Sequence, residues 1–207
     1  MNNIENYCIN HSIKESQLLE DIKKFTYENE EAPQMISGPI VGNILGVLIK
    51  AMHAKQVLEI GMFTGYSALN MAQFIPKGGT IQTCEIMSRH VKNAQIFFNK
   101  SEYKDSIIIH EGDALNTLEN FKINTFDLIF IDADKINYIE YYKKSMHLIK
   151  SKGVIVLDNM LWGGSVLNPK DEQSKILKKL AKIINEDERN INILLPVRDG
   201  LMICYVQ

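Results

Sequence analysis

Acidic and amide side chains follow two apolar runs in the second half of the chain. Asp132 comes directly after the run at residues 126–131, and Asp158 and Asn159 come at the end of the run that begins at residue 153. If both runs are parallel strands, their carboxyl ends meet at the sheet edge where ligands bind. Two carboxylates and an amide carbonyl suit Mg²⁺, whereas zinc would prefer histidine or cysteine. The competing interpretation is that Asp132 and Asp158 only cap the helices that follow.

A lysine follows the first of these acids. Lys135 lies three residues after Asp132, close enough to share the field of a bound cation. A divalent cation favours the neutral form of a neighbouring lysine, which could then act as a general base on a hydroxyl acidified by the same cation. The alternative is a solvated lysine or an ion pair with Asp134.

A glycine-containing loop follows the first apolar run of the core. Residues 59–67 contain Gly61 and Gly65 in a G-x-x-x-G spacing, which differs from the G-x-G-x-x-G of dinucleotide folds. The loop therefore suits a ligand without a pyrophosphate, such as S-adenosylmethionine. Glu85 ends the next run, 20 residues after Gly65, where an acid could accept hydrogen bonds from both ribose hydroxyls. The exit of the third run, Gly112-Asp113-Ala114, supports this interpretation over a simple tight turn.

The elements that position these residues are predicted from hydrophobic periodicity. Short β-type runs at residues 56–60, 80–85, 107–110, 126–131 and 153–158 alternate with helical segments, which indicates a parallel sheet with helices on both faces. Two further strands at 191–196 and 201–206 are joined by four residues and predict an antiparallel hairpin. Helices are expected at 12–28, with Ser12 as N-cap, at 39–53 and at 170–184. The predicted fold class is α/β, with a seven-stranded, mostly parallel, Rossmann-like sheet.

Composition limits the protein to one ordinary domain. The chain has 207 residues, of which 45% are hydrophobic and 23% charged, and its net charge of −2 lacks the basic surplus of proteins held on phosphate backbones. A single domain is expected, with a helical cap at 1–54 and a core at 55–207. Three cysteines far apart in sequence favour reduced thiols. Without a leader-like N-terminus or an uncharged apolar run near 20 residues, the expectation is a soluble, cytoplasmic protein with no membrane partner.

Motifs along nearly the whole chain resemble the cation-dependent class I O-methyltransferases, the group that includes catechol and caffeoyl-coenzyme A O-methyltransferases. The resemblance rests on Gln34-Met35-Ile36-Ser37, LEIGMFTGYSAL from Leu58, Glu85, EGDAL from Glu111, FDLIFIDADKINY from Phe126, GVIVLDNMLWGG from Gly153 and DGL from Asp199. The order and spacing of these motifs agree with the family.

The resemblance implies a role for each matching residue. Asp132, Asp158 and Asn159 would hold Mg²⁺, Mn²⁺ or Ca²⁺, and Lys135 would be the catalytic residue. Positions matching the S-adenosylmethionine site are Ser37, Glu59, Gly61, Phe63, Ser67, Glu85, Asp113, Ala114 and Asp132. Met35 and Trp162 match positions around the substrate, although Trp162 could instead anchor its loop on the core. The resemblance also implies a homodimer.

The methyl acceptor stays open at this stage. The first hypothesis is a catechol or another vicinal-dihydroxy aromatic, and the second is the wobble 5-hydroxyuridine of transfer RNA. A stripe of Lys175, Lys178, Lys179 and Lys182 could contact phosphates, or could be an ordinary solvated helix face. A dinucleotide-dependent oxidoreductase or a non-catalytic nucleotide-binding module is disfavoured by the glycine spacing. Arg198 stands at a turn position that is often small in the family, which leaves the shape of the acceptor pocket open.

Overall fold

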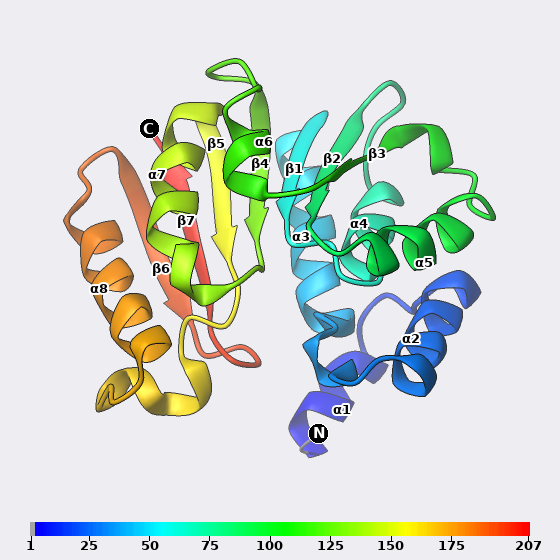
Figure 1. Cartoon of the computed structure of the whole chain (residues 1–207), viewed down its shortest axis with the longest axis horizontal. Helices are drawn as coiled ribbons and strands as arrows, with labels where there is room; N and C mark the ends of the chain where they lie inside the picture. Colours follow the sequence, from blue (N-terminus) through cyan, green and yellow to red (C-terminus); the bar gives the residue numbers. More distant parts are fainter. Residues whose placement is uncertain (1–2) are drawn as a thin grey trace.

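Seven strands form one mixed sheet in the order β3-β2-β1-β4-β5-β7-β6 (Figure 1). The strands are β1 Gln56–Ile60, β2 Thr80–Glu85, β3 Ile107–Glu111, β4 Phe126–Ile131, β5 Ile149–Leu157, β6 Asn190–Leu195 and β7 Leu201–Val206. Strands β1 to β5 pair in parallel, and β7 runs antiparallel to β5 and β6. The structure is a computed structural model that describes residues 3–207. The predicted α/β fold with a C-terminal antiparallel hairpin is confirmed.

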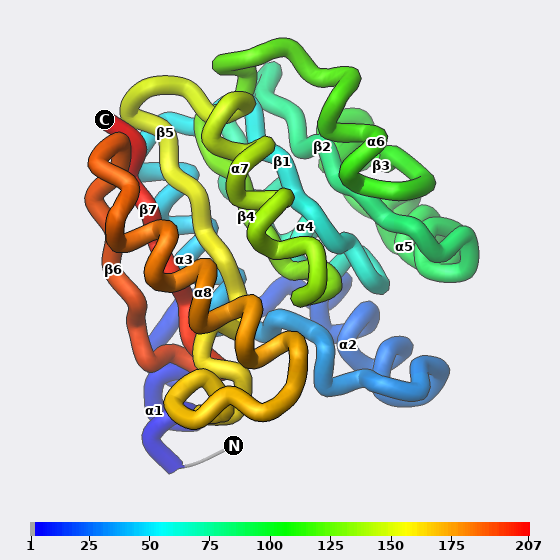
Figure 2. Tube along the Cα trace, turned by 60° about the vertical axis from the view of Figure 1, so that its left-hand side comes forward, coloured from blue at the N-terminus to red at the C-terminus, as the bar shows by residue number. Residues whose placement is uncertain are grey.

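Helices cover both faces of the sheet. They are α1 Asn3–Asn10, α2 Gln17–Asn29, α3 Gly38–Met52, α4 Tyr66–Ala72, α5 Ser88–Phe98, α6 Ala114–Leu118, α7 Tyr138–Leu148 and α8 Glu172–Glu186, with short 3-10 turns η1 Pro33–Met35, η2 Lys104–Ser106, η3 Lys135–Asn137 and η4 Trp162–Leu167. Figure 2 shows α7 and α8 on one side of the sheet and α3 on the other.

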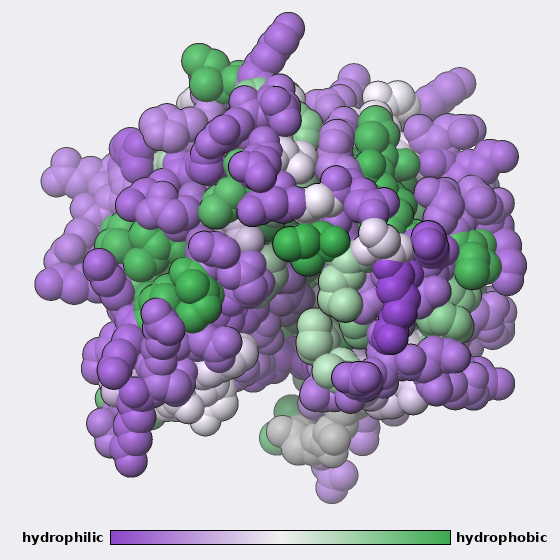
Figure 3. All heavy atoms as spheres, viewed as in Figure 1, coloured by the Kyte–Doolittle hydropathy of each residue, from purple (hydrophilic) through white to green (hydrophobic). Residues whose placement is uncertain are grey.

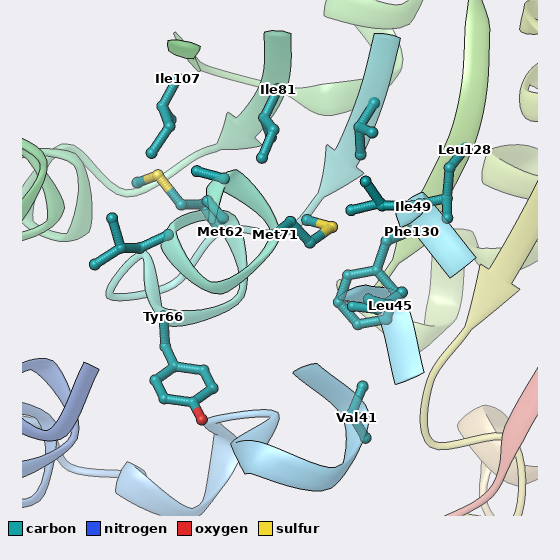
Figure 4. Close-up of a cluster of buried hydrophobic side chains, with 14 of the residues drawn as sticks. Val41, Leu45, Ile49, Met62, Tyr66, Met71, Ile81, Ile107, Leu128 and Phe130 are labelled. Carbon is teal, nitrogen blue, oxygen red and sulfur yellow. The ribbon is translucent and has the colours of Figure 1, made fainter. Parts of the chain in front are cut away.

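The strands are apolar on both faces because each face is packed against helices. In β4, Leu128 and Phe130 contribute to one core cluster and Ile129 and Ile131 to the other, and all four are fully buried. The first cluster includes residues from α2 to α5, and the second includes residues from α6 to α8. Figure 4 shows members of the first cluster from α3, such as Leu45, and from α4, such as Tyr66. This explains why residues 128–131 of β4 are a continuous apolar run rather than an alternating one.

The N-terminal segment differs from the prediction. An additional helix, α1, precedes α2, and the Ser12 hydroxyl donates to Cys8 O at the end of α1 instead of capping the next helix. The helix α2 begins at Gln17 after Ser16. Glu15, three residues after Ser12, accepts hydrogen bonds from Lys23 and from the Tyr66 hydroxyl. Helix α2 thereby becomes tied to α4, and α2 and α3 contribute to the same core cluster as the sheet.

The C-terminal elements match the prediction with shifted ends. Strand β5 begins at Ile149, four residues earlier than expected, and its pairing with β4 shifts register between Phe126 and Leu128. Helix α8 begins at Glu172 because the Asp171 side chain accepts from Ser174 N as its N-cap. The β6–β7 connection spans residues 196–200, one residue longer than predicted.

One apolar stretch exceeds the expectation from sequence. Residues Pro33–Met52 form a 20-residue helical stretch with mean hydropathy 1.6, enough to cross a membrane by length and composition alone. The sequence-based expectation that no apolar run approaches 20 residues is therefore wrong for this stretch. Half of the stretch is buried, and Val41, Leu45 and Ile49 are fully buried in the first core cluster. Core packing therefore accounts for its apolar character.

Candidate active site

The strand order places the candidate site between β1 and β4. Chain order reverses at this pair, and ligands of open α/β sheets bind outside the carboxyl ends of the strands at such a switch point. Backbone hydrogen bonds continue past the strands there, from Asp132 N to Ile60 O (2.9 Å) and from Asp158 N to Ile131 O (3.0 Å). The sheet itself therefore brings Gly61, Asp132 and Asp158 to one edge.

A cavity of about 830 Å³ opens at this edge. Figure 3 shows the molecule hollowed below its centre, on the side where β4 and β5 end. Among the predicted site residues, the cavity is lined by Met35, Ser37, Gly61, Phe63, Ser67, Glu85, Asp113, Ala114, Asp132, Lys135, Asp158, Asn159 and Trp162. This volume lies in the upper part of the range for small-molecule sites and leaves room for more than one small ligand.

Glu59 lies beneath the cavity rather than on its surface. Its side chain is fully buried, and the Thr83 hydroxyl donates to Glu59 Oε2 at 2.5 Å. Burial raises the pKa of Glu59 to about 7, against the opposing effect of hydrogen bonds from Ser67 and Thr83. The structure thus places Glu59 under the glycine loop, where it supports Ser67.

The glycine loop follows β1 and requires its glycines. Gly61 has φ 97°, and a β-carbon there would lie 2.1 Å from Asp132 O. Gly65 has φ 88°, and a β-carbon there would lie 2.7 Å from the Phe98 ring. Only glycine combines this left-handed backbone with such close contacts. Phe63, between them, also has a positive φ of 52°, so the loop holds a strained conformation at the cavity surface.

Glu85 is oriented by the backbone around it. Its carboxylate oxygens accept hydrogen bonds from Phe63 N and Met87 N, each at 2.8 Å. His90 lies behind the carboxylate, with Nδ1 3.4 Å from Glu85 Oε1 and Nε2 3.4 Å from Glu30 Oε2. The His90 ring also packs edge-on against Phe63 at a centroid distance of 4.8 Å. The predicted ribose acid is therefore fixed between two strand ends.

The third strand end supplies a further polar contact to the cavity. Asp113 caps α6, and its Oδ1 accepts from Leu115 N at 2.7 Å. Gly112 N donates to Glu85 O, which places Asp113 and Ala114 beside the end of β2.

Two acids meet at the ends of β4 and β5. Asp158 is 3% exposed, and its Oδ1 accepts from Asn159 N at 2.7 Å. Burial raises the pKa of Asp158 to about 7, and the negative charge of Asp132 adds to this effect. Ser37 donates to Asp132 Oδ2 at 3.5 Å. The backbone of Asn159 is left-handed, with φ 58°, so the amide follows the acid in a constrained turn.

The donor set fits a hard divalent cation. Within residues 3–207, no three His, Cys, Asp or Glu side chains are grouped as a metal site, so any site here depends on the Asn159 amide. Asp132 and Asp158 are close enough for their charges to oppose each other, and Asp158 is almost without solvent. A cation would relieve this opposition, and oxygen donors favour Mg²⁺, Mn²⁺ or Ca²⁺ over zinc.

Lys135 is held against these acids. Its side chain is buried, and Nζ lies 3.3 Å from Asp132 Oδ1 and 3.0 Å from Ala133 O. Nζ also contacts the hydroxyl of Tyr138, which donates to Asp158 O at 3.1 Å. The alternative of a solvated lysine or a pair with Asp134 is thereby wrong. Asp134 instead caps the next turn and accepts from the Tyr141 hydroxyl.

Met35 and Trp162 both line the cavity. Met35 is 56% exposed at the end of η1, and the Trp162 ring lies 5.9 Å from Lys135 Nζ. Trp162 also packs against the second core cluster. Its contacts are therefore compatible with a place beside the substrate and with an anchor for its loop on the core.

Three further residues of this region were not predicted as site residues from the sequence. Tyr138 closes the lysine site, His90 supports Glu85, and Arg198 lines the cavity. Tyr138 follows Lys135 by three residues in the motif FDLIFIDADKINY, and this spacing could have indicated that it contacts the lysine. His90 offered none, because its partner Glu30 comes from a distant part of the chain.

Comparisons with known proteins identify the family of the chain. A family model described as O-methyltransferase matches residues 9–206. The chain belongs to the O-methyltransferase family. It is 31% identical to a caffeoyl-CoA O-methyltransferase of Stellaria longipes, over 97% of this chain and 89% of that protein.

Solved structures agree in fold. An O-methyltransferase of Bacillus cereus in complex with SAH superposes with TM-score 0.90 at 27% identity, covering 99% of this chain and 97% of that one. An SAH-bound methyltransferase of Podospora anserina gives TM-score 0.89 at 26% identity, covering 99% and 94%. The predicted S-adenosylmethionine-dependent O-methyltransferase, of caffeoyl-CoA type, is confirmed. The transfer-RNA alternative gains no support, and its lysine stripe lies on the exposed face of α8.

Proposed function

We propose that this O-methyltransferase moves the methyl group of S-adenosylmethionine to one hydroxyl of a vicinal-dihydroxy aromatic, with a divalent cation at Asp132, Asp158 and Asn159. The observation that carries the proposal is the placement of Lys135 between Asp132 and Tyr138 on the same cavity that the glycine loop and Glu85 line. One cavity thus combines a place for the methyl donor with a basic group.

Different residues bind the methyl donor and the methyl acceptor. Glu85 accepts hydrogen bonds from the ribose of the donor, and the glycine loop allows the donor to approach the backbone closely. Met35 and Trp162 contact the aromatic ring of the acceptor. Asp132, Asp158 and Asn159 would hold a divalent cation, whose positive charge would favour loss of a proton from a nearby acceptor hydroxyl.

Lys135 removes the proton. The neutral amine accepts the hydroxyl proton at Nζ, the acceptor oxygen forms a bond to the methyl carbon, and the carbon–sulfur bond breaks to give S-adenosylhomocysteine. The sulfur loses its positive charge as it gains the bonding pair, and Lys135 gains one positive charge with the proton, so charge is conserved. Catalysis then depends mainly on holding the oxygen in line with the carbon–sulfur bond.

The test is methyl transfer from labelled S-adenosylmethionine to catechol, measured with Mg²⁺ and with EDTA. We expect label only with the cation, and a large loss of kcat in Asp158→Ala and Lys135→Ala. S-adenosylhomocysteine binding, measured by calorimetry, should persist in Lys135→Ala. Full activity in EDTA would overturn the metal role, and loss of cofactor binding alone in Lys135→Ala would overturn the basic role.

Three expectations stay predictions: the homodimer implied by the resemblance, the absence of a membrane partner and the cytoplasmic location. Sedimentation of the purified chain tests the first.

A further inference from the structure

Arg198 has a strained backbone in a loop that is firmly held. Its φ is 51°, a left-handed conformation that costs a non-glycine residue about 1 kcal/mol or more. The β6–β7 loop is bound to the loop after β5 by hydrogen bonds from Met160 N to Gly200 O (2.9 Å) and from Leu161 N to Asp199 O (2.8 Å). Glycine would fit this position without strain. An arginine here therefore suggests a use for its side chain.

The Arg198 side chain forms part of the cavity wall. It is 27% exposed and lines the cavity together with Asp158 and Trp162. Nη1 forms an ion pair with Glu5 Oε1 at 3.4 Å, and Nη2 donates to Ile36 O at 3.5 Å, which leaves other N–H groups of the guanidinium without a hydrogen-bond partner among the described residues. Both distances are at the long end for hydrogen bonds, and a guanidinium carries five N–H donors. The group therefore has donors to offer a ligand.

Charge makes Arg198 distinct among the residues that line the cavity. Among the described residues that line the cavity, Lys135 is the one lysine and Arg198 the one arginine, and several acids line it as well. Lys135 is 5% exposed, and its Nζ already contacts Asp132 and Tyr138. An anionic ligand in this cavity would therefore meet Arg198.

Arg198 is also close to the acid end of the site. Arg198, Asp158 and Asn159 line the same cavity. An acceptor with its hydroxyls at Asp158 and Lys135 thus lies within the field of the guanidinium.

We propose that Arg198 binds a carboxylate of the methyl acceptor, so that the preferred acceptor is a vicinal-dihydroxy aromatic acid. A guanidinium presents parallel N–H groups that match the two oxygens of a carboxylate. The inference rests on the proposed function, because it assumes that the acceptor hydroxyls face Lys135.

The experiment compares 3,4-dihydroxycinnamate with the corresponding alcohol, which has the same carbon skeleton without the charge. The quantity is the ratio of their kcat/KM values in the wild type and in Arg198→Met. We expect the ratio to fall about tenfold or more, the usual effect of one lost charge-assisted contact. Arg198→Lys should restore part of the ratio. Lys178→Gln, which removes a charge on the exposed face of α8, should leave the ratio unchanged.

A third acceptor separates carboxylate from phosphate recognition. The coenzyme A thioester of the same acid lacks the carboxylate but carries phosphates. If Arg198→Met lowers kcat/KM for the thioester alone, the carboxylate assignment is wrong.

A structural role for Arg198 gives a different result. Loss of the contacts to Glu5 and Ile36 alone would lower kcat/KM equally for the acid and the alcohol, and that outcome overturns the inference. Arg198→Gly, which removes the charge and the backbone strain together, should fold well and show the same change in ratio as Arg198→Met. If the wild type methylates neither acceptor with Mg²⁺ present, the proposed function itself fails.

Discussion

The α-carbon of Gly61 lies directly against the backbone of Asp132. A β-carbon at Gly61 would be 2.1 Å from Asp132 O and 2.7 Å from its carbonyl carbon. The loop that approaches the methyl donor and the strand end that carries the first acid therefore share one close contact. Neither loop can shift without the other, which couples the cofactor side of the cavity to the acid side.

Gly61→Ala should abolish S-adenosylhomocysteine binding and lower the melting temperature, because the added methyl group displaces the Asp132 backbone. Calorimetry and thermal unfolding measure the two effects. Gly78→Ala is the matched control, since Gly78 has a similar φ of 80° but nothing within 4 Å of the added carbon. This control should lose about 1 kcal/mol of stability and keep its cofactor affinity. Equal losses of affinity in both variants would contradict the contact argument.

His90→Gln should weaken cofactor binding more than it slows the reaction. The imidazole lies 3.4 Å from both Glu85 and Glu30, so its loss leaves the two carboxylates without their shared partner. We expect the KM for S-adenosylmethionine to rise about tenfold, with kcat at saturating cofactor changed far less. His147→Gln, on the exposed side of α7, is the control. A fall in kcat with KM unchanged would argue against a role in positioning Glu85.

Local patterns were sufficient to predict the sheet and the edge at which most of the candidate residues line one cavity. Strands buried on both faces are largely apolar, as residues 128–131 of β4 show, and parallel pairing takes their following residues to one edge. Asp132 and Asp158 could therefore be placed together although 26 residues separate them. The glycine loop was predictable because backbone constraints at Gly61 are visible in residue type.

Contacts made by the N-terminal helices were not predictable in the same way. Ser12 has the sequence context of a helix cap, yet it bonds to Cys8 because an earlier helix, α1, ends there. Glu30 lies 60 residues from His90, and only the packing of α2 beside α5 brings them together. Glu59 matches a cofactor position by motif, but its side chain lies on the buried side of β1.

Tyr138→Phe should lower kcat by about one to two orders of magnitude while leaving S-adenosylhomocysteine affinity unchanged. The hydroxyl contacts Lys135 Nζ and donates to Asp158 O at 3.1 Å, so its removal frees the amine from its position. Tyr205→Phe, at a 40% exposed position on β7, removes a hydroxyl without touching the site. Pre-steady-state methyl transfer measures the chemical step. An unchanged rate in Tyr138→Phe would show that Lys135 is positioned by Asp132 and Ala133 alone.

Asp187→Asn should change the acid stability of the fold without touching the cavity. The Arg189 side chain holds the pKa of Asp187 at about 2, below the ordinary value of 3.8, with further donation from the Tyr142 hydroxyl. Because this pKa is depressed in the folded state, the ion pair stabilises the protein fully above about pH 4. That contribution is lost as the pH falls towards 2. Urea unfolding between pH 2 and 5 should show a steeper loss for the wild type than for Asp187→Asn, and parallel curves would contradict the assignment.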